Sequence, residues 1–279
     1  MEFIYSLAEI VKDEKVHALW PVSEVNDLKP MTVEQPENPL RQPHRLISNI
    51  SAPELIECVP EVSNGKAVLI IPGGGYQFVS IDNEGIEVGR CLAKMGYHAF
   101  CLNYRLPDCT PKNQDIASIQ DAQQALHVVK TLCIGHEVGV LGFSAGGHLA
   151  AWLSTLPVSD KPKFVCLMYP VVSMNLDITH LGSYQTLKSE LNDPTLISEL
   201  SIEHRITSDT PPMLIMHAKD DLSVVPEHSQ RLHSALNEHG VSSKLELFEQ
   251  GGHGFGAYVN EAHDARNWLD RFHAWISSQ

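Results

Sequence analysis

Hydrophobic positions along this chain fall into two alternating patterns, short continuous apolar runs and longer segments with helical spacing. A continuous run bounded by turn residues predicts a strand that is buried on both faces, as in a parallel sheet. The apolar runs occupy residues 67–71, 138–141, 163–169 and 212–217, and residues 97–104 and 244–248 are also strand-like. Together they predict a mainly parallel central sheet.

The segments between these runs predict helices. The clearest lies over residues 115–132, where Ile116, Ile119, Ala122, Leu126 and Val129 repeat at steps of three and four. Further helices are predicted over residues 82–95, 226–240 and 262–277. Strands that alternate with helices in this way indicate an α/β fold with helices on both faces of the sheet.

Two segments depart from the alternation. The first 45 residues are rich in proline and irregular, and they predict an edge hairpin or an arm. Residues 173–210 are polar, and such insertions commonly form a lid or a pocket wall, although a surface excursion without substrate contact is equally compatible with the pattern. The length of 279 residues suits one domain that spans residues 1–279.

The sequence Gly-Phe-Ser-Ala-Gly at 142–146 lies where a predicted strand turns into a predicted helix. A G-x-S-x-G motif at such a junction is typical of a nucleophile elbow, which exposes the hydroxyl of the serine, here Ser144. Side chains at Gly142 and Gly146 are expected to collide with the neighbouring backbone. The pentapeptide alone is weakly specific, so its interpretation depends on suitable partners elsewhere in the chain.

An acid and a histidine follow in the order that such hydrolases use. Asp220 and Asp221 come after the strand at 212–217, and His253 lies between glycines after the strand at 244–248. Loops after parallel strands meet at the carboxyl edge of the sheet, where ligands bind. We predict His253 as the base and Asp221 as the acid, with Asp220 as the alternative.

Three glycines, Gly73, Gly74 and Gly75, follow the strand at 67–71. Glycine lets backbone N–H groups approach a substrate closely, and in hydrolases of this kind such a loop provides one oxyanion donor and the residue after the nucleophile, here Ala145, provides another. A flexible loop or a phosphate cradle is the alternative, but a P-loop requires a Lys-Ser/Thr ending that this loop lacks.

Several of these motifs together resemble a known family. The chain is similar, over roughly residues 45–279, to the bacterial acetyl esterase and acetyl-xylan esterase group of the α/β-hydrolase superfamily. The resemblance rests on Pro-Gly-Gly-Gly-Tyr at 72–76, Asn-Tyr-Arg-Leu at 103–106, Gly-Phe-Ser-Ala-Gly-Gly-His-Leu-Ala at 142–150, the Asp-Asp…Val-Pro loop and Gly-Gly-His-Gly-Phe-Gly at 251–256.

The resemblance implies an α/β-hydrolase fold, a catalytic triad and an oxyanion hole. The triad would consist of Ser144, Asp221 and His253, and the oxyanion donors would be Gly74, Gly75 and Ala145. The chain departs from related branches at two places. Pro72 stands where the lipase and esterase branch has histidine, which favours the sugar-esterase side, and His217-Ala218-Lys219 replaces the more usual His-Gly-x before the acid.

Composition restricts the partners. The chain has 20 basic and 34 acidic residues, and the net charge of −14 disfavours nucleic acid and anionic membranes and suits a small neutral ester, such as an esterified carbohydrate. The charge leaves the oligomeric state open.

No signal peptide or membrane span is visible, so a cytoplasmic location is expected unless a leader was removed. The six cysteines lack a C-x-x-C motif and predict reduced thiols.

The predicted function is hydrolysis of short acyl esters, acetyl esters of sugars or xylo-oligosaccharides in particular. The triad chemistry requires neither a metal nor an organic cofactor. Histidine pairs at metal-ligand spacing are also missing, because His228 and His233 are five residues apart and do not share a helix face. Feruloyl esters, aryl-formamides and peptides remain alternatives on the same triad, although peptidases of this type usually carry a propeller domain for which 279 residues leave no room. A catalytically silent hydrolase fold that acts as a binding protein is the alternative from another class.

Overall fold

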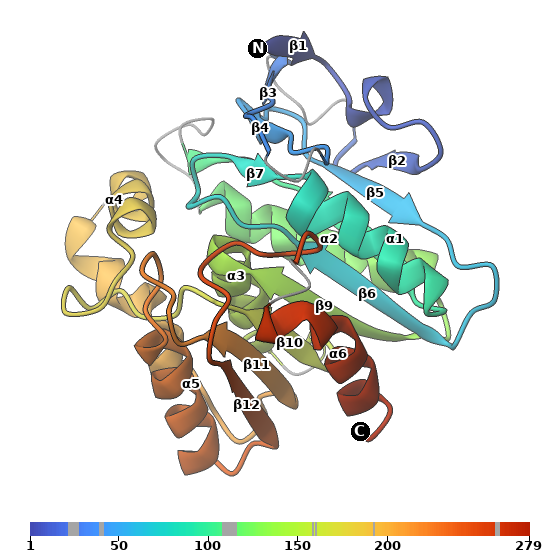
Figure 1. Cartoon of the computed structure of the whole chain (residues 1–279). Coiled ribbons are helices and arrows are strands. Elements are labelled where there is room, and N and C mark those ends of the chain that lie inside the picture. Colours follow the sequence, from blue (N-terminus) through green and yellow to red (C-terminus); the bar gives the residue numbers. More distant parts are fainter. Residues whose placement is uncertain are drawn as a thin grey trace.

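A twisted sheet runs through the centre of the computed structural model (Figure 1). The structure describes residues 1–21, 28–38, 42–107, 116–157, 159, 161–191, 193–259 and 263–279. Within these residues the main sheet has eight strands, in the order β12 (Ser243–Phe248), β11 (Met213–Ala218), β10 (Val165–Met168), β9 (Glu137–Phe143), β6 (Lys66–Ile71), β8 (His98–Asn103), β5 (Glu54–Cys58) and β2 (Lys15–Ala18). The strands from β12 to β8 are parallel, and β5 and β2 pair antiparallel at one edge. The predicted mainly parallel sheet is confirmed.

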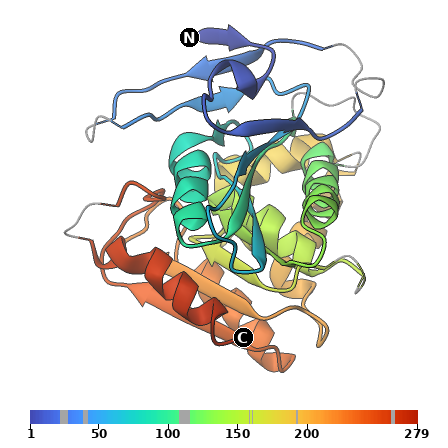
Figure 2. The ribbon, with the colours of Figure 1, turned by 90° about the vertical axis from the view of Figure 1, so that its right-hand side faces the viewer.

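Helices cover both faces of this sheet, as the alternation predicted. One face carries α2 (Ala117–Leu132), α3 (Ser144–Ser154) and α5 (Glu227–Glu238), and the other carries α1 (Glu87–Lys94) and α6 (Trp268–Ile276). Figure 2 shows α1 and α2 on opposite sides of the strands. The fold is therefore three layers of helix, sheet and helix.

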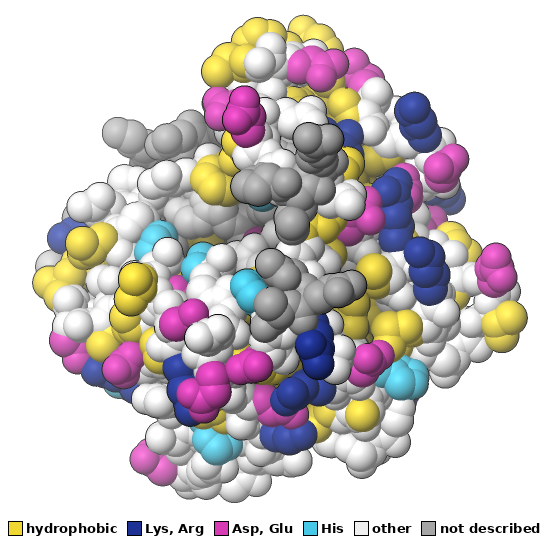
Figure 3. Space-filling view, in the orientation of Figure 1, with side chains coloured by type: hydrophobic (Ala, Val, Ile, Leu, Met, Phe, Trp, Pro, Cys, Tyr) yellow, Lys and Arg dark blue, Asp and Glu magenta, His cyan; other side chains and the backbone are white. Residues whose placement is uncertain are grey.

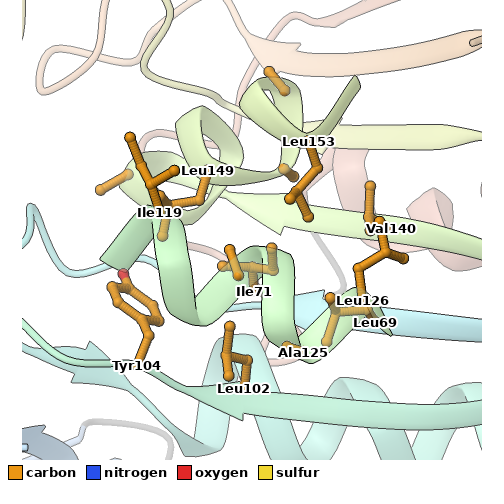
Figure 4. Close-up of a cluster of buried hydrophobic side chains, with 14 of the residues drawn as sticks. Leu69, Ile71, Leu102, Tyr104, Ile119, Ala125, Leu126, Val140, Leu149 and Leu153 are labelled. Carbon is orange, nitrogen blue, oxygen red and sulfur yellow. The ribbon is translucent and has the colours of Figure 1, made fainter. Parts of the chain in front are cut away.

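Alternate residues of the central strands β6, β9, β10 and β11 pack into two separate cores. Leu69 and Ile71 of β6 join the cluster beneath α2 and α3, which Figure 4 shows, whereas Val68 and Ile70 contact the cluster beneath α1 and α6. Both sets of side chains are completely buried. This explains why the strands appear in the sequence as continuous apolar runs.

Some predicted helices have different boundaries in the structure. The segment at 82–95 begins with a π-helical turn, Asp82–Ile86, before α1. The segment at 262–277 begins with a short 3-10 helix, Asp264–Asn267, before α6. The predicted first residues Asp115 and Ala262 lie outside the described residues.

The N-terminal segment is more regular than the predicted hairpin or arm. Strands β1 (Glu2–Ile4), β3 (Met31–Glu34), β4 (Leu46–Ser48) and β7 (Val79–Ser80) form a second, antiparallel sheet. This sheet lies over one end of the main sheet (Figure 1). Ile4, Leu7, Met31 and Val33 are buried in the same core as α2, so the segment belongs to the packed body of the domain.

The polar segment at 173–210 contains α4 (Leu181–Glu190) and two 3-10 helices, Pro194–Leu200 and Ile202–His204. Helix α4 projects to one side of the molecule (Figure 1).

The described cysteines, Cys58, Cys91, Cys101, Cys133 and Cys166, are all free, as predicted, and Cys109 lies outside the described residues. Among the helices that the structure describes, none combines the length and the apolar character needed to cross a bilayer.

Candidate active site

Ser144 lies at a sharp turn between β9 and α3. Its φ of +51° is a left-handed conformation that serine rarely adopts. Glycine is required on both sides, because a Cβ atom at Gly142 would lie 2.5 Å from the carbonyl oxygen of Gly146, and one at Gly146 would lie 2.1 Å from that of Ile71. The predicted collisions with the backbone are thus confirmed, and they explain how the turn presents the Ser144 hydroxyl at the edge of the sheet.

The three side chains of the predicted triad meet at this edge. His253 Nε2 lies 2.8 Å from Ser144 Oγ, and His253 Nδ1 lies 2.6 Å from Asp221 Oδ2. Because Nδ1 faces a carboxylate, it carries the proton, which leaves Nε2 free to accept the proton of the serine hydroxyl. The geometry is that required for activation of Ser144 as a nucleophile.

Asp221 lies in an environment that keeps its carboxylate ionised. Its Oδ1 accepts the N–H groups of Ser223 (2.9 Å) and Val224 (3.0 Å), and its Oδ2 lies 3.2 Å from Nε2 of the buried His217. Burial raises the pKa of Asp221, but the hydrogen bonds from His217 and His253 outweigh burial and hold this pKa well below its ordinary value. Asp221 is therefore a permanent negative charge behind the imidazole.

The neighbouring acid, Asp220, has a different set of contacts. Its Oδ1 accepts the N–H groups of Gly251 (2.9 Å) and Gly252 (2.8 Å), which lie just before His253. Asp220 thus fixes the loop that carries the histidine, while Asp221 contacts the imidazole itself. The geometry favours Asp221 over Asp220 as the acid.

The glycine loop after β6 lies directly beside Ser144. Strands β6 and β9 are adjacent and parallel, with Ile71 opposite Gly142, so the segments that follow them meet. The approach is so close that a Cβ atom on Gly73 would lie 2.8 Å from that of Ser144. Only glycine allows this contact between the loop and the serine.

Backbone N–H groups are available at this junction. Gly74 and Gly75 have φ of +133° and +63°, and in the described part of the chain their N–H groups donate to no protein acceptor. Ala145 lies in the first turn of α3, where N–H groups lack intrahelical acceptors and the helix dipole is positive. The glycine loop and the first turn of α3, which carry the three predicted oxyanion donors, thus meet beside Ser144.

A buried histidine supports the glycine loop from below. Nδ1 of His148 lies 2.7 Å from the hydroxyl of Tyr76, and its Nε2 lies 2.7 Å from the carbonyl oxygen of Leu200. Burial lowers the pKa of His148 to about 4, so the ring is neutral, with Nε2 as donor and Nδ1 as acceptor. His148 is a structural member of the Gly-Gly-His-Leu-Ala motif.

The segment at 173–210 contacts the glycine loop through His180. This residue caps α4 by accepting the N–H of Ser183 at Nδ1 (3.2 Å), and its Cε1 lies 3.4 Å from the position of a Cβ atom on Gly75. Burial and the nearby His253 lower the pKa of His180. Figure 3 shows histidine side chains gathered on the molecular surface beside α4.

A pocket of about 350 Å³ adjoins the same loop. Neutral hydrogen-bonding side chains make up most of its lining, which consists of Ser48, Asn49, Tyr76, Gln77, Leu106, Gln185, Thr186 and Ser189. Gln77 follows the oxyanion loop and donates its N–H to the carbonyl oxygen of Gly74 (3.0 Å). Helix α4 therefore forms a wall of a polar pocket that is continuous with this loop.

Sequence reasoning missed four residues that support the site, namely His217, Asn83, Glu84 and Tyr169. His217 contacts the acid, and the other three contact the loops that carry the base and the oxyanion donors. Only His217 had a signal in the sequence, its position four residues before Asp221.

Among the residues that the structure describes, no three His, Cys, Asp or Glu side chains group as a metal site requires.

The sheet, the elbow and the order of the three side chains define an α/β-hydrolase. A sequence model of the prolyl oligopeptidase family matches residues 111–279, and a second model, BD-FAE, matches residues 58–162. The first match covers more than half of the chain, and the protein belongs to the prolyl oligopeptidase family.

Individual relatives agree with the predicted resemblance. An acetylxylan esterase of Xylanibacter ruminicola is 33% identical over 239 residues, which are 80% of this chain and 49% of that protein. Endo-1,4-beta-xylanase B of Butyrivibrio fibrisolvens is 26% identical over 67% of this chain and 32% of that protein. The chain thus spans half or less of the length of these two relatives.

A solved structure extends the comparison to a protein of similar length. The crystal structure of an acetyl ester-xyloside bifunctional hydrolase from Caldicellulosiruptor lactoaceticus superimposes with a TM-score of 0.76 and 29% identity, and covers 95% of this chain and 96% of that one. The predicted resemblance to the acetyl-xylan esterase group and the predicted α/β-hydrolase fold are confirmed.

Proposed function

We propose that this protein is a serine carboxylesterase that removes short acyl groups, above all acetyl groups, from esterified sugars or xylo-oligosaccharides. The observation that carries the proposal is the alignment of Ser144, His253 and Asp221, with contacts of 2.8 Å and 2.6 Å, beside the glycine loop that follows β6. The similarity to an acetylxylan esterase and to an acetyl ester-xyloside hydrolase supports the choice of substrate.

The reaction proceeds through an acyl-enzyme. Ser144 Oγ attacks the ester carbonyl carbon while His253 Nε2 takes the serine proton, and the Asp221 carboxylate stabilises the imidazolium that forms. The tetrahedral intermediate then collapses, and His253 returns the proton to the oxygen of the departing alcohol. Water, deprotonated by His253, attacks the acyl group in the second half of the cycle and releases the acid.

The oxyanion is stabilised by N–H groups of Ala145, Gly74 and Gly75. These donors are fixed before substrate binds, Ala145 by its place in α3 and the glycines by the turn that follows β6. Because they are oriented in advance, each contributes on the order of 3 kcal/mol to lowering the barrier.

The polar pocket beside the oxyanion loop supports a carbohydrate as the alcohol portion. Amide and hydroxyl side chains such as Gln77, Gln185 and Thr186 can donate to and accept from sugar hydroxyls without carrying charge. We infer that α4, and with it the segment at 173–210, acts as a pocket wall.

A substrate series tests this assignment. Turnover of p-nitrophenyl esters should fall from acetate to octanoate. The Gln185→Ala variant should have a KM for acetylated xylobiose that is about 3- to 10-fold higher than that of wild type. Its KM for p-nitrophenyl acetate should be unchanged, because only the sugar uses the lost hydrogen bond. Gln230→Ala, an exposed glutamine on α5, is the matched control. A KM for acetylated xylobiose that is equal in wild type and Gln185→Ala would refute the role of the pocket.

The same assay separates the alternatives. Faster hydrolysis of a feruloyl ester, an aryl-formamide or a prolyl p-nitroanilide than of any acetyl ester would replace the acetyl esterase by that activity. Wild-type protein that hydrolyses none of them would favour the silent binding protein. The cytoplasmic location and the absence of nucleic-acid partners stay predictions of the sequence.

A further inference from the structure

The π-helical turn Asp82–Ile86 lies beneath the candidate active site, and all five of its residues are buried. Three of them are polar. Asp82 pairs with Arg45, with contacts of 2.6 to 3.2 Å, and so ties the turn to the N-terminal sheet. Asn83 and Glu84 instead contact the loops that carry the reacting groups.

Asn83 holds the loop that carries His253. Its Nδ2 donates to the carbonyl oxygen of Gly254 (2.8 Å), its Oδ1 accepts the N–H of Tyr258 (2.9 Å), and its own carbonyl oxygen accepts the N–H of Ala257 (2.9 Å). Three hydrogen bonds therefore fix this loop from within the turn.

Glu84 connects two loops at once. Its Oε2 accepts the N–H of Gly73 (2.8 Å), directly before the oxyanion donors. Its Oε1 accepts the hydroxyl proton of Tyr169 (2.8 Å), and the oxygen of that hydroxyl accepts the N–H of Gly256 (2.9 Å) in the His253 loop. One carboxylate thus bridges the oxyanion loop and the base loop.

Tyr169 also contacts the base directly. It follows β10 with a φ of +38°, an unusual conformation for tyrosine, and its ring packs edge to face against His253 with centroids 4.9 Å apart. The bond to Glu84 fixes the orientation of this ring. A change at Glu84 is therefore transmitted to His253 through Tyr169 and to the oxyanion loop through Gly73.

We propose that Glu84 is a positioning residue of this active site, and that its carboxylate sets the spacing between the oxyanion donors and His253. The proposal rests on the proposed function only in that Ser144 and His253 react with an ester. It adds a role for a residue that does not touch the substrate.

Both oxygens of Glu84 act as acceptors, Oε2 from the N–H of Gly73 and Oε1 from the hydroxyl of Tyr169. Burial raises the pKa of Glu84 above its ordinary value, and the nearby His253 together with the hydrogen bonds from Tyr169 and Gly73 opposes this rise. The titratable groups that face Glu84 are His253, Tyr169, Tyr104 and, at longer range, His44. His253 in turn faces Asp221 and His180.

The variant Glu84→Gln tests the proposal, because the neutral amide cannot accept from both partners. We expect kcat for p-nitrophenyl acetate to fall roughly 10- to 100-fold with little change in KM, since the reacting groups are displaced while substrate contacts persist.

Glu54→Gln is the matched control. Glu54 is also buried and also accepts one hydroxyl, from Ser6 (2.6 Å), and one backbone N–H, from Leu7 (2.7 Å), but these partners belong to the N-terminal segment. Both variants should unfold at a lower temperature, and only Glu84→Gln should lower kcat while KM stays nearly unchanged. If folded Glu84→Gln matches Glu54→Gln or wild type in kcat, the proposal is wrong.

Tyr169→Phe provides a second test, in case Glu84→Gln does not fold. This change keeps the ring against His253 and removes the link between Glu84 and Gly256. We expect Tyr169→Phe to lower kcat by less than Glu84→Gln does. The double variant Glu84→Gln/Tyr169→Phe should lower kcat by less than the product of the two single fold-losses, because both changes disrupt one network. A kcat of Tyr169→Phe equal to that of wild type would contradict the link.

An organophosphonate probe separates this proposal from the choice of substrate. In its reaction a bond forms between Ser144 Oγ and phosphorus, p-nitrophenolate leaves with the electrons of the broken P–O bond, and His253 takes the serine proton. If wild type reacts with the probe but hydrolyses no acetyl ester, the proposed substrate fails and the rate of p-nitrophenolate release still tests Glu84. Equal rates for wild type and Glu84→Gln would overturn the positioning role.

Discussion

Replacement of Ser144 by alanine is expected to lower kcat/KM for p-nitrophenyl acetate by at least about 10⁴-fold. The variant keeps the glycine loop, His253 and the substrate pocket, so any residual turnover must come from water activated in the site. The fold should persist, because Ser144 is at a turn that is fixed by the close contacts of Gly142 and Gly146.

A serine at the other end of the same helix provides the control. Ser154 is buried in α3, and its hydroxyl donates to the carbonyl oxygen of Ala151 (2.6 Å). Initial rates for Ser144→Ala and Ser154→Ala, with thermal unfolding of both, separate chemistry from folding. Activity of Ser144→Ala within tenfold of wild type would show that another residue is the nucleophile.

The second large effect is expected for Asp221→Asn, which should lower kcat by roughly 10⁴-fold. The neutral amide cannot stabilise the imidazolium of His253, and its NH₂ group beside Nδ1 favours the wrong tautomer. The loss should persist at all pH values where the wild type works, because the pKa of Asp221 lies far below that range.

Asp220→Asn is a matched control that differs by one position. Its Oδ1 can still accept the N–H groups of Gly251 and Gly252, so the variant should retain most of the activity. Steady-state kinetics of the two variants compare the adjacent acids directly. If Asp220→Asn proves the more damaging change, the assignment of the acid must be reversed.

The layers of the fold were predictable because they depend on local patterns. Strands β6, β9, β10 and β11 are buried on both faces, so each appears as a continuous apolar run. Parallel order then places the segments after these strands at one edge, which is why motifs far apart in the sequence meet in the structure, such as Ser144 and His253, which are 109 positions apart. The chain order of the motifs was sufficient to predict this meeting.

The N-terminal sheet was not predictable in the same way. Its strands are two to four residues long and pair with partners that come from distant parts of the sequence, as Leu46 does with Ser80. Strands of that length contain too few positions for an apolar pattern. Their pairing depends on the main body of the domain, which local sequence does not describe.

The residues that support the site were likewise not predictable from the sequence. In the sequence, Asn83 and Glu84 appear as ordinary polar residues at the start of a helix, where acidic residues are common. Their roles come from contacts with Gly254 and Gly73, and both partners are backbone groups without a side-chain signature. Only the three-dimensional arrangement shows that these polar residues are buried and what they hold.

The central claim is that Ser144 is the nucleophile of an ester-cleaving site, and mass spectrometry of the phosphonylated protein tests it most directly. After reaction with a p-nitrophenyl organophosphonate, we expect a single adduct, located on the peptide that contains Ser144, and no adduct on Ser144→Ala. An adduct on another residue, or an equal yield from Ser144→Ala, would contradict this account.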